Sequence, residues 1–335
     1  MSSSRQTFIA SSAAFATIGI LRRPADAAEF TYKLGFDEPL SHPMTIRANE
    51  AAQKIKLDSG GRLEIQVFPN SQLGDDTAMI SQVRLGALHM TLMSDGILSG
   101  VVPLAAIENV TFAFSNYKQA FEAMDGPLGA NVRAAIAKAG LYPFEKIWCS
   151  GFKQVTNSVR LLNSPADFKG LKFRVPPSAM EVALFKAVDA SAVPINLNEA
   201  YAAMQSHLVD GASLPIVTVE TLKFYEVQKY IAITNHLFTG YSVVANGEAW
   251  QALPKDLREL TERHFNAAGL LERTDIENLD AMMESKLKSQ GMQVTHPDSA
   301  AFRRDMRSGG FYKGWREQFG SEAWALLEKS VGGLT

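Results

Sequence analysis

Several residue types on which whole classes of protein depend are scarce in this sequence. The 335 residues include one cysteine, Cys149, which excludes an intrachain disulfide and any CxxC metal or redox motif. The 33 lysines and arginines nearly balance the 35 acidic residues, and no basic run occurs, so we predict no nucleic-acid partner. With 46% hydrophobic residues, the chain is long enough to be stabilised by a sizeable apolar core instead.

Motifs for catalysis and for cofactor binding are also missing. The sequence has no GxSxG elbow, no Walker-type GxxxxGK(S/T) loop, no GxGxxG turn and no HExxH pair. The six histidines are scattered without the spacing of metal ligands. We therefore predict no catalytic residue, no metal site and no cofactor, and we expect a binding protein rather than an enzyme.

The first 28 residues differ from the rest of the chain. Arg5 precedes a stretch of small and apolar residues over 8–21, and the segment ADAAEF then offers a cleavage site near residues 27–28. This layout predicts a secretory signal peptide over residues 1–28, and hence export. A membrane anchor is the alternative, but the stretch is short and rich in serine and alanine for a membrane span.

The remainder alternates between strand and helix patterns. Apolar alternation over 29–36, 62–69 and 88–94 indicates strands, and helical spacing over 44–61 and 75–87 separates them. This order predicts a parallel α/β sheet. The second half shows the same alternation of strand and helix patterns. Strands are predicted at 171–177, 191–196, 212–217 and 240–246, and helices at 179–190, 197–211 and 254–290.

One charged residue interrupts the strand pattern of the second half. The segment DFKGLKFRVPP, residues 167–177, places Arg174 among Leu171, Phe173 and Val175. A buried arginine needs a partner, because an unpaired buried charge is costly. The partner is either a carboxylate of this protein or one that arrives with a ligand. Ligands bind at strand ends of open α/β sheets, and a guanidinium grips a carboxylate with two parallel hydrogen bonds, which favours the second interpretation.

Several segments carry a specific resemblance to a known family. The chain closely resembles the DctP-type solute-binding proteins of tripartite ATP-independent periplasmic (TRAP) transporters in NSPADFKGLKFRVPPSAM, NEAYAAMQSHLVDGASLP and KFYEVQKYIAITNH. It is similar to them also in SGGRLEIQVFPNSQLGDDTAMISQVRLGALHMTLMS, DGPLG and QGMQVTHPD. The resemblance covers nearly the whole chain after residue 28, in order.

The resemblance implies an α/β fold of the periplasmic-binding-protein-like type II class, with two domains, a cleft and a long helix spanning both. Domain I would comprise residues 29–151 and about 239–280, and domain II residues 152–238 and about 281–335. Such proteins trap a small organic acid in the cleft, in the periplasm, by hinge closure. The loaded protein docks on a small and a large membrane subunit, DctQ- and DctM-like, which couple uptake to a sodium gradient.

The resemblance also assigns binding residues. In the family the arginine of LKxR grips the substrate carboxylate, and Arg174 has that place here. The family's GFRQ reads GFKQ in this chain, so Lys153 takes the position of a second basic residue, as a point charge without the planar fork. Lys153 either contacts the acid or is a solvated surface lysine. Further residues expected at or near the ligand are Phe36, Asp75, Asp76, Ser94, Pro177, Leu197 and Leu214.

Some of these positions leave alternatives open. Phe36 is either a ligand contact or a core residue, and Asp75 and Asp76 either reach the ligand or cap a helix. Leu214 stands where the family commonly has an asparagine, since this chain reads DGASLP rather than DGQENP. With Leu197, it predicts a less polar pocket, in which each unpaired hydroxyl of a sugar acid would cost about 1–3 kcal/mol.

We therefore expect a monocarboxylate with an apolar body, either an aromatic acid or a short 2-oxo or 2-hydroxy acid. A C4-dicarboxylate is the alternative if Lys153 serves a second carboxylate. A sensory binding protein, or an α/β enzyme acting on a small acid, are the competing functions.

Overall fold

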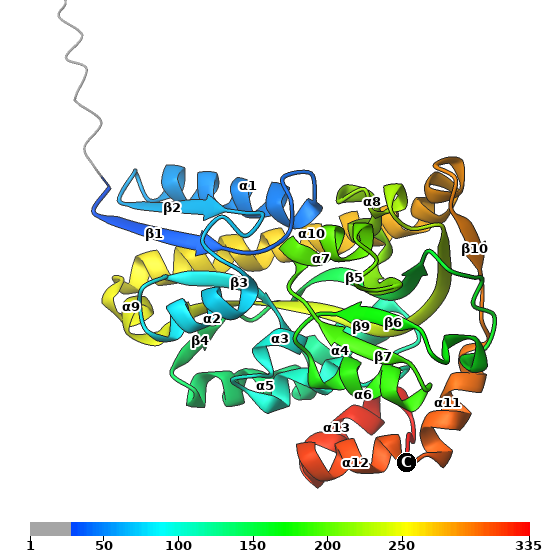
Figure 1. The fold of residues 1–335 in the computed structure, drawn as a ribbon. Helices are drawn as coiled ribbons and strands as arrows, with labels where there is room; N and C mark the ends of the chain where they lie inside the picture. Colours follow the sequence, from blue (N-terminus) through cyan, green and yellow to red (C-terminus); the bar gives the residue numbers. More distant parts are fainter. Residues whose placement is uncertain (1–27) are drawn as a thin grey trace, which may run out of the picture.

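A single mixed β-sheet links the parts of the chain that the structure describes (Figure 1). The structure is a computed structural model that describes residues 28–335, so the predicted signal peptide lies outside the described residues but for Ala28. The strands are ordered β2-β1-β3-β9-β5-β8-β6-β7, and β4 and β10 also pair with β9. Their bounds are β1 (Phe30–Gly35), β2 (Leu63–Phe68), β3 (Met90–Ser94), β4 (Leu141–Pro143), β5 (Trp148–Asn157), β6 (Lys172–Val175), β7 (Ser191–Pro194), β8 (Gly211–Pro215), β9 (Tyr230–Asn246) and β10 (Gln293–Thr295).

The N-terminal part of the sheet is parallel, as the alternation of strand and helix patterns predicts. β1 pairs in parallel with β2 and with β3. The prediction of a parallel sheet is wrong for β9, which runs antiparallel to both β3 and β5. Residues 230–246 form one continuous strand, of which the sequence pattern predicts only 240–246. Gly240 lies within it, because a Cβ there would collide with the carboxylate of Glu108.

Two long strands cross from the N-terminal part of the sheet to the part formed by the middle of the chain. β9 pairs with β3 through residues 241–245, and with β5 and β10 through residues 230–232. β5 carries register shifts on both sides of the segment from Gly151 to Lys153, and such bulges re-aim side chains. β5 and β9 are therefore the strands that would join the two predicted domains, whose limits stay a prediction.

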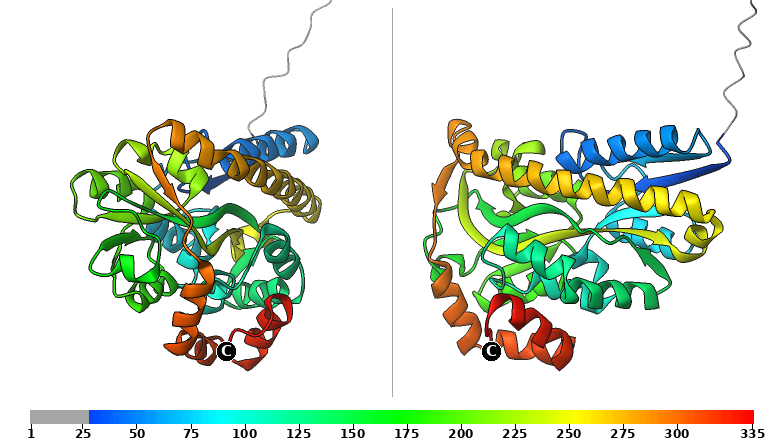
Figure 2. Two further views of the ribbon diagram at one scale, coloured as in Figure 1. Left: turned by 90° about the vertical axis from the view of Figure 1, so that its right-hand side faces the viewer. Right: turned by 180° about the vertical axis from the view of Figure 1, so that it is seen from behind.

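The longest helix, α10 (Lys255–Ser289), runs along one side of the molecule (Figure 2). Its 35 residues correspond to a length of about 52 Å. It packs against α1, β5 and α8, and so contacts elements from both halves of the chain. The long helix predicted over 254–290 is confirmed, with Pro254 at the N-cap position.

Shorter helices cover the sheet on its two faces (Figures 1 and 2). Within residues 28–335, no helix combines the length and the apolar character that a membrane crossing requires. The helices are α1 (Pro43–Asp58), α2 (Asp76–Arg84), α3 (Asp95–Leu98), α4 (Tyr117–Asp125), α5 (Pro127–Lys138), α6 (Ala179–Ala187), α7 (Leu197–Gln205), α8 (Ile216–Thr221), α9 (Gly247–Ala252), α11 (Ser299–Ser308), α12 (Phe311–Phe319) and α13 (Ser321–Val331), with 3-10 turns η1 (Pro103–Asn109), η2 (Pro165–Phe168) and η3 (Phe224–Glu226).

Candidate ligand-binding site

A buried cavity lies where several strands of the sheet end. β1, β3, β6 and β8 contribute residues at or just after their carboxyl ends, and β5 and β9 contribute from their middle. Such strand ends form the crevice in which open α/β sheets bind ligands. The space between the lining atoms is about 330 Å³, including the part open to solvent. The lining residues are Asp37, Glu38, Asp76, Ser94, Ile97, Ser150, Lys153, Arg174, Pro176, Leu197, Leu214, Pro215, Thr218, Thr239 and Tyr241.

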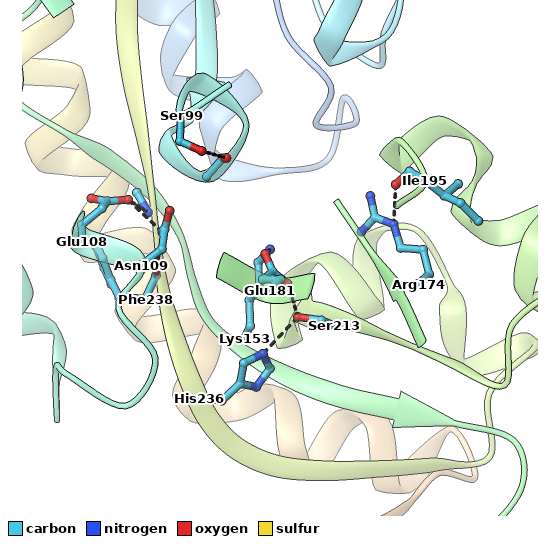
Figure 3. A network of polar contacts seen from close by, with 12 residues as sticks. Ser99, Glu108, Asn109, Lys153, Arg174, Glu181, Ile195, Ser213, His236 and Phe238 are labelled. Atoms are coloured by element: carbon cyan, nitrogen blue, oxygen red, sulfur yellow. Dashed lines mark hydrogen bonds and ion pairs between the residues drawn. The ribbon is translucent and has the colours of Figure 1, made fainter. Parts of the chain in front are cut away.

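Arg174 lines this cavity from β6, just before the two prolines that follow the strand. The residue is 2% exposed. Its Nε donates a hydrogen bond to the carbonyl oxygen of Ile195 at 2.8 Å (Figure 3). Among residues 28–335, no carboxylate oxygen lies within 4.0 Å of the guanidinium, and the Nη atoms donate no hydrogen bond to protein. The internal ion pair is therefore not formed, and both Nη groups can donate to a carboxylate from outside.

The positive charge of Arg174 is fixed in place. Burial lowers the pKa of Arg174, and the negative charges of Glu181, Asp76 and Asp37 act in the opposite direction. An arginine keeps its proton even so, because the ordinary guanidinium pKa lies above about 12. The strand and the Ile195 carbonyl hold the side chain in one geometry, so little conformational entropy is lost when it grips an anion.

The structure excludes the alternative that Lys153 is a solvated surface residue, whereas its contact with the acid stays a prediction. Lys153 comes from β5, is 4% exposed and lines the cavity. Its Nζ lies 2.6 Å from Oε1 of Glu181, in an ion pair that is buried on both sides. Burial lowers the pKa of Lys153, and Glu181 opposes that change. The positive charge of Lys153 is thus already paired within the protein.

A chain of polar contacts fixes Glu181 in its turn (Figure 3). Oε2 of Glu181 accepts a hydrogen bond from Oγ of Ser213 at 2.6 Å. The Ser213 hydroxyl also contacts Nε2 of His236 at 3.0 Å, and the Thr234 hydroxyl contacts Nδ1 of the same ring at 2.8 Å. Burial lowers the pKa of His236 to about 3, so its ring is neutral at neutral pH.

Sequence reasoning missed Glu181, although its spacing carries the signal. Glu181 stands three and four residues before Leu184 and Phe185, and seven before Val188, which is the spacing of one helix face. Those three apolar residues are buried, so Glu181 lies on the buried face of α6. A buried carboxylate needs a partner, and Lys153 supplies it.

Three buried carboxyl groups form another side of the cavity, here named the acidic wall: Asp37, Glu38 and Asp76. Asp37 and Glu38 follow β1, and Asp76 is the first residue of α2. Burial raises the pKa of all three, and the charge of Asp37 raises those of Glu38 and Asp76 further. We name Lys153 and Arg174 the basic wall. One cavity therefore holds buried charges of both signs.

Several other residues that the sequence predicted at the ligand do line the cavity. Ser94 does so from the end of β3, Leu197 from the start of α7, and Leu214 from β8. Ile97 joins the two leucines in the lining. The cavity thus has an apolar side as well as the acidic wall, to which the predicted residue Asp76 belongs.

Three predicted residues lie elsewhere. Pro177 is not part of the lining, and its neighbour Pro176 is. Phe36 is fully buried in the apolar core between β1, α1 and α10, as the core alternative predicts. Asp75 caps α2, with its Oδ1 accepting from the Ala78 amide at 2.8 Å.

No sequence pattern indicates the four hydroxyl-bearing residues that complete the lining. They come from β5, β9 and α8, where a serine, threonine or tyrosine fits an ordinary strand or helix pattern. The Tyr241 hydroxyl donates to both carboxylate oxygens of Asp37 at 3.4 Å. These residues are Ser150, Thr218, Thr239 and Tyr241.

A second, larger hollow lies on the surface between α2, α5 and α9. It is lined largely by exposed residues, among them Arg84, Leu85 and Gln251, and it contains no buried charge. In the described part of the chain, no group of three or more His, Cys, Asp or Glu side chains could hold a metal ion. The buried cavity is therefore the candidate site.

Comparison with known proteins gives the family. Residues 35–309 match the family model described as bacterial extracellular solute-binding protein, family 7, or DctP. The chain is 31% identical over 294 residues to the sialic acid-binding periplasmic protein SiaP of Vibrio cholerae, an alignment that covers 87% of this chain and 91% of that protein.

Solved structures share the fold. A TRAP periplasmic solute-binding protein from Sulfurospirillum deleyianum, with bound succinate, has a TM-score of 0.84 and 28% identity over 90% of this chain and 98% of its own. One from a Polaromonas species, bound to D-erythronate, has a TM-score of 0.85 and 27% identity over 89% of this chain and 98% of its own. The predicted type II α/β fold is confirmed, and these relatives are binding proteins rather than enzymes. The chain therefore belongs to the DctP family of TRAP periplasmic solute-binding proteins.

Proposed function

We propose that this protein captures a small organic acid by a contact between the ligand carboxylate and Arg174. The observation that supports this most is a buried guanidinium with no carboxylate partner among residues 28–335, in a cavity at the strand ends. An unpaired buried charge destabilises a protein, so its retention indicates a partner from outside. Two charge-assisted hydrogen bonds plus modest apolar burial are enough for a Kd near 1 μM, which is about −8 kcal/mol.

The ligand is a monocarboxylate. Lys153 is neutralised by Glu181, so Arg174 alone among the two basic residues of the cavity can meet a carboxylate. A second carboxylate would approach the acidic wall, where like charges repel. Leu197, Leu214 and Ile97 offer an apolar surface to the body of the acid. Aromatic acids and short 2-oxo or 2-hydroxy acids fit these features.

A C4-dicarboxylate is the second candidate, because the solved relative from Sulfurospirillum deleyianum holds succinate. That ligand would require Lys153 to turn from Glu181 to a second carboxylate. The family relation and the signal pattern over residues 1–28 support export to the periplasm. There the loaded protein would deliver its acid to a small and a large membrane subunit, DctQ- and DctM-like.

A thermal-shift panel tests this function. The protein is heated with aromatic acids, short 2-hydroxy and 2-oxo acids, C4-dicarboxylates and sugar acids, and so are two variants. Arg174→Ala is expected to lose all ligand-induced stabilisation, whereas Arg316→Ala, at an exposed arginine of α12, keeps it. Stabilisation of the Arg174→Ala variant by the same acid would remove the assignment. A large shift with a sugar acid alone would overturn the preferred ligand class.

A further inference from the structure

The acidic wall lacks a cation. Asp37, Glu38 and Asp76 are buried in the same cavity, and no lysine or arginine nitrogen lies within 4.0 Å of any of them among residues 28–335. His42 is the nearest basic group to Glu38, at 3.9 Å between Nε2 and Oε2. Burial lowers the pKa of His42 to about 3, so this ring carries no charge at neutral pH. Arg174 attracts Asp37 and Asp76 only from beyond 4.0 Å, so no lysine or arginine of residues 28–335 pairs directly with an acid of the wall. Buried acids without a direct partner can accept a further cation.

Asp37 and Asp76 are hydrogen-bonded to each other, whereas the hydrogen bonds from protein hydroxyls to the acidic wall are long. Asp37 accepts from the Tyr241 hydroxyl at 3.4 Å, and Oε1 of Glu38 accepts from the Thr218 hydroxyl at 3.3 Å. Oε2 of Glu38 is buried and accepts no hydrogen bond, although the residue is 1% exposed and lines the cavity. An unsatisfied buried acceptor is rare in native proteins. The neutral His42 ring carries its proton on Nε2, since Nδ1 accepts from the Met44 amide, but at 3.9 Å it makes no hydrogen bond to Oε2. Oε2 of Glu38 can therefore accept a hydrogen bond from a ligand.

We propose that the ligand is a zwitterion, whose carboxylate binds Arg174 and whose protonated nitrogen binds the acidic wall. This inference rests on the proposed contact between the ligand carboxylate and Arg174, and it replaces the oxo or hydroxyl group of the preferred acids by a protonated nitrogen. A protonated nitrogen supplies both things that the wall lacks, a positive charge and N–H donors. A hydroxyl supplies a donor without the charge, and a 2-oxo oxygen is an acceptor that would face other acceptors.

A bound metal ion is the other source of a cation, and the geometry argues against it. No three His, Cys, Asp or Glu side chains gather as a metal site in residues 28–335. A protonated nitrogen with several N–H donors therefore fits the acidic wall better than a metal ion does.

Whether protons are released or taken up on binding distinguishes a zwitterionic ligand from a simple anion. Burial raises the pKa of Asp37, Glu38 and Asp76, which favours their protonated forms in the empty cavity. A bound ammonium lowers those pKa values and releases protons, whereas a bound anion raises them and takes protons up. The charged or titratable groups that act on the wall from other elements are His42, Lys153, Arg174, Tyr241 and Glu272. Asp75, at the cap of α2, acts on Asp76.

The experiment compares acids that share a carbon skeleton and differ in one group. Calorimetry is run with leucine, 2-hydroxy-4-methylpentanoate and 4-methyl-2-oxopentanoate, with phenylalanine, phenyllactate and phenylpyruvate, and with 3- and 4-aminobutanoate and their hydroxy analogues. In at least one series the nitrogen-bearing acid is expected to bind at least about tenfold more tightly than its analogues. It should release protons, seen as a dependence of the measured heat on the buffer's ionisation heat. Tighter binding of a hydroxy or oxo acid, proton uptake by every binder, or no binding of any nitrogen-bearing acid would overturn the inference.

Two variants then locate the contact. Glu38→Gln and Asp76→Asn keep the side-chain size and remove the charge, so each should weaken the nitrogen-bearing acid about tenfold and change its hydroxy analogue less than about threefold. Asp75→Asn, at the neighbouring helix cap, is the matched control and should not separate the two acids. Equal weakening of both acids would contradict the charge contact. The failure of one proposal can be told from the failure of the other. If binding depends on Arg174 but a nitrogen-free acid binds more tightly, the zwitterion proposal is wrong and the carboxylate contact with Arg174 stands.

Discussion

The two charged walls of one cavity differ in how their charges are balanced. On the basic wall, Lys153 is paired with Glu181 at 2.6 Å, whereas Arg174 has no carboxylate within 4.0 Å in residues 28–335. On the acidic wall, Asp37, Glu38 and Asp76 share one cavity without a charged basic partner in the same part of the chain. Both walls are buried, so solvent screening does not explain the difference.

The difference shows that a buried negative charge and a buried positive charge can be neutralised in different ways. A buried carboxyl group can take up a proton, and burial raises the pKa of all three acids of the acidic wall. Arginine cannot lose its proton in a protein. Arg174 is therefore the cavity residue whose charge most needs an incoming partner. The raised pKa values make protonation of the acidic wall easier, an outlet that Arg174 does not have.

The largest expected effect on binding comes from substituting Arg174 of the basic wall. Arg174→Ala should weaken binding of the transported acid by about 1,000-fold or more, since truncating one partner of a buried charge pair costs about 4 kcal/mol. Arg174→Lys keeps the charge but loses the planar fork, and should weaken binding by about tenfold to a hundredfold. Calorimetric titration measures both. Equal losses in the two variants would show that the fork, rather than the charge, decides binding.

The second-largest expected effect comes from removing the counter-charge of Lys153, which leaves both Lys153 and Arg174 without a paired carboxylate. Glu181→Gln leaves Lys153 buried without its counter-charge, so the free energy of unfolding should fall by about 3–4 kcal/mol. The same variant should bind a C4-dicarboxylate at least about tenfold more tightly than the wild type does, because Lys153 is then free to meet a second carboxylate. Urea denaturation and calorimetry with succinate measure these changes.

A double variant is the control for this change. Lys153→Met with Glu181→Leu removes both charges of the buried pair, and such replacements are often neutral or stabilising. It should keep the stability of the wild type to within about 1 kcal/mol and gain no dicarboxylate binding. Succinate binding by the double variant would mean that Lys153 is not the second carboxylate site.

A third change tests burial as the cause of the raised pKa values. Asp95 is fully buried but does not line the cavity, and burial raises its pKa from 3.8 to about 7. The folded state therefore binds this proton more tightly than the unfolded state, and the resulting stability is lost as the pH rises toward 7 and above. Between pH 5 and pH 8 the loss is about 2.5 kcal/mol, and Asp95→Asn should lack it. Urea denaturation of both proteins at the two pH values measures the difference, and identical pH dependence would contradict the prediction.

The smallest effect concerns the apolar side of the cavity. Leu214 lies on β8, is 2% exposed and faces the cavity. Leu214→Asn adds a buried donor and acceptor, so affinity for a hydroxyl-rich sugar acid should rise about tenfold relative to that for an aliphatic monocarboxylate. Leu214→Met keeps the volume and the apolar character, and should leave the ratio unchanged. A competition titration measures the ratio, and an unchanged ratio in the asparagine variant would place the ligand away from β8.

The sequence predicts most of the elements because their apolar spacing is regular. The helix 75–87 and the strand 88–94 appear as α2 and β3, and the helix 254–290 appears as α10. Only residues 240–246 of β9 are predicted as a strand, because the polar run through Thr234 and His236 interrupts the apolar alternation before them. In the structure those polar side chains are buried and bonded to each other.

The site was predicted less completely than the fold, for a physical reason. Arg174 could be found because a charge within an apolar strand is a local signal. The pairing of Lys153 with Glu181 joins residues 28 positions apart on different elements, and no local pattern reports which cation a buried acid will meet. The acidic wall likewise forms only when the loop after β1 and the start of α2 come together in space.

The most direct measurement is a crystal structure of the protein with the acid that binds most tightly in calorimetry. The account predicts a carboxylate bonded to both Nη atoms of Arg174, with Lys153 still paired to Glu181. A guanidinium turned to Asp37 or Asp76, with the ligand carboxylate held by other residues, would contradict it.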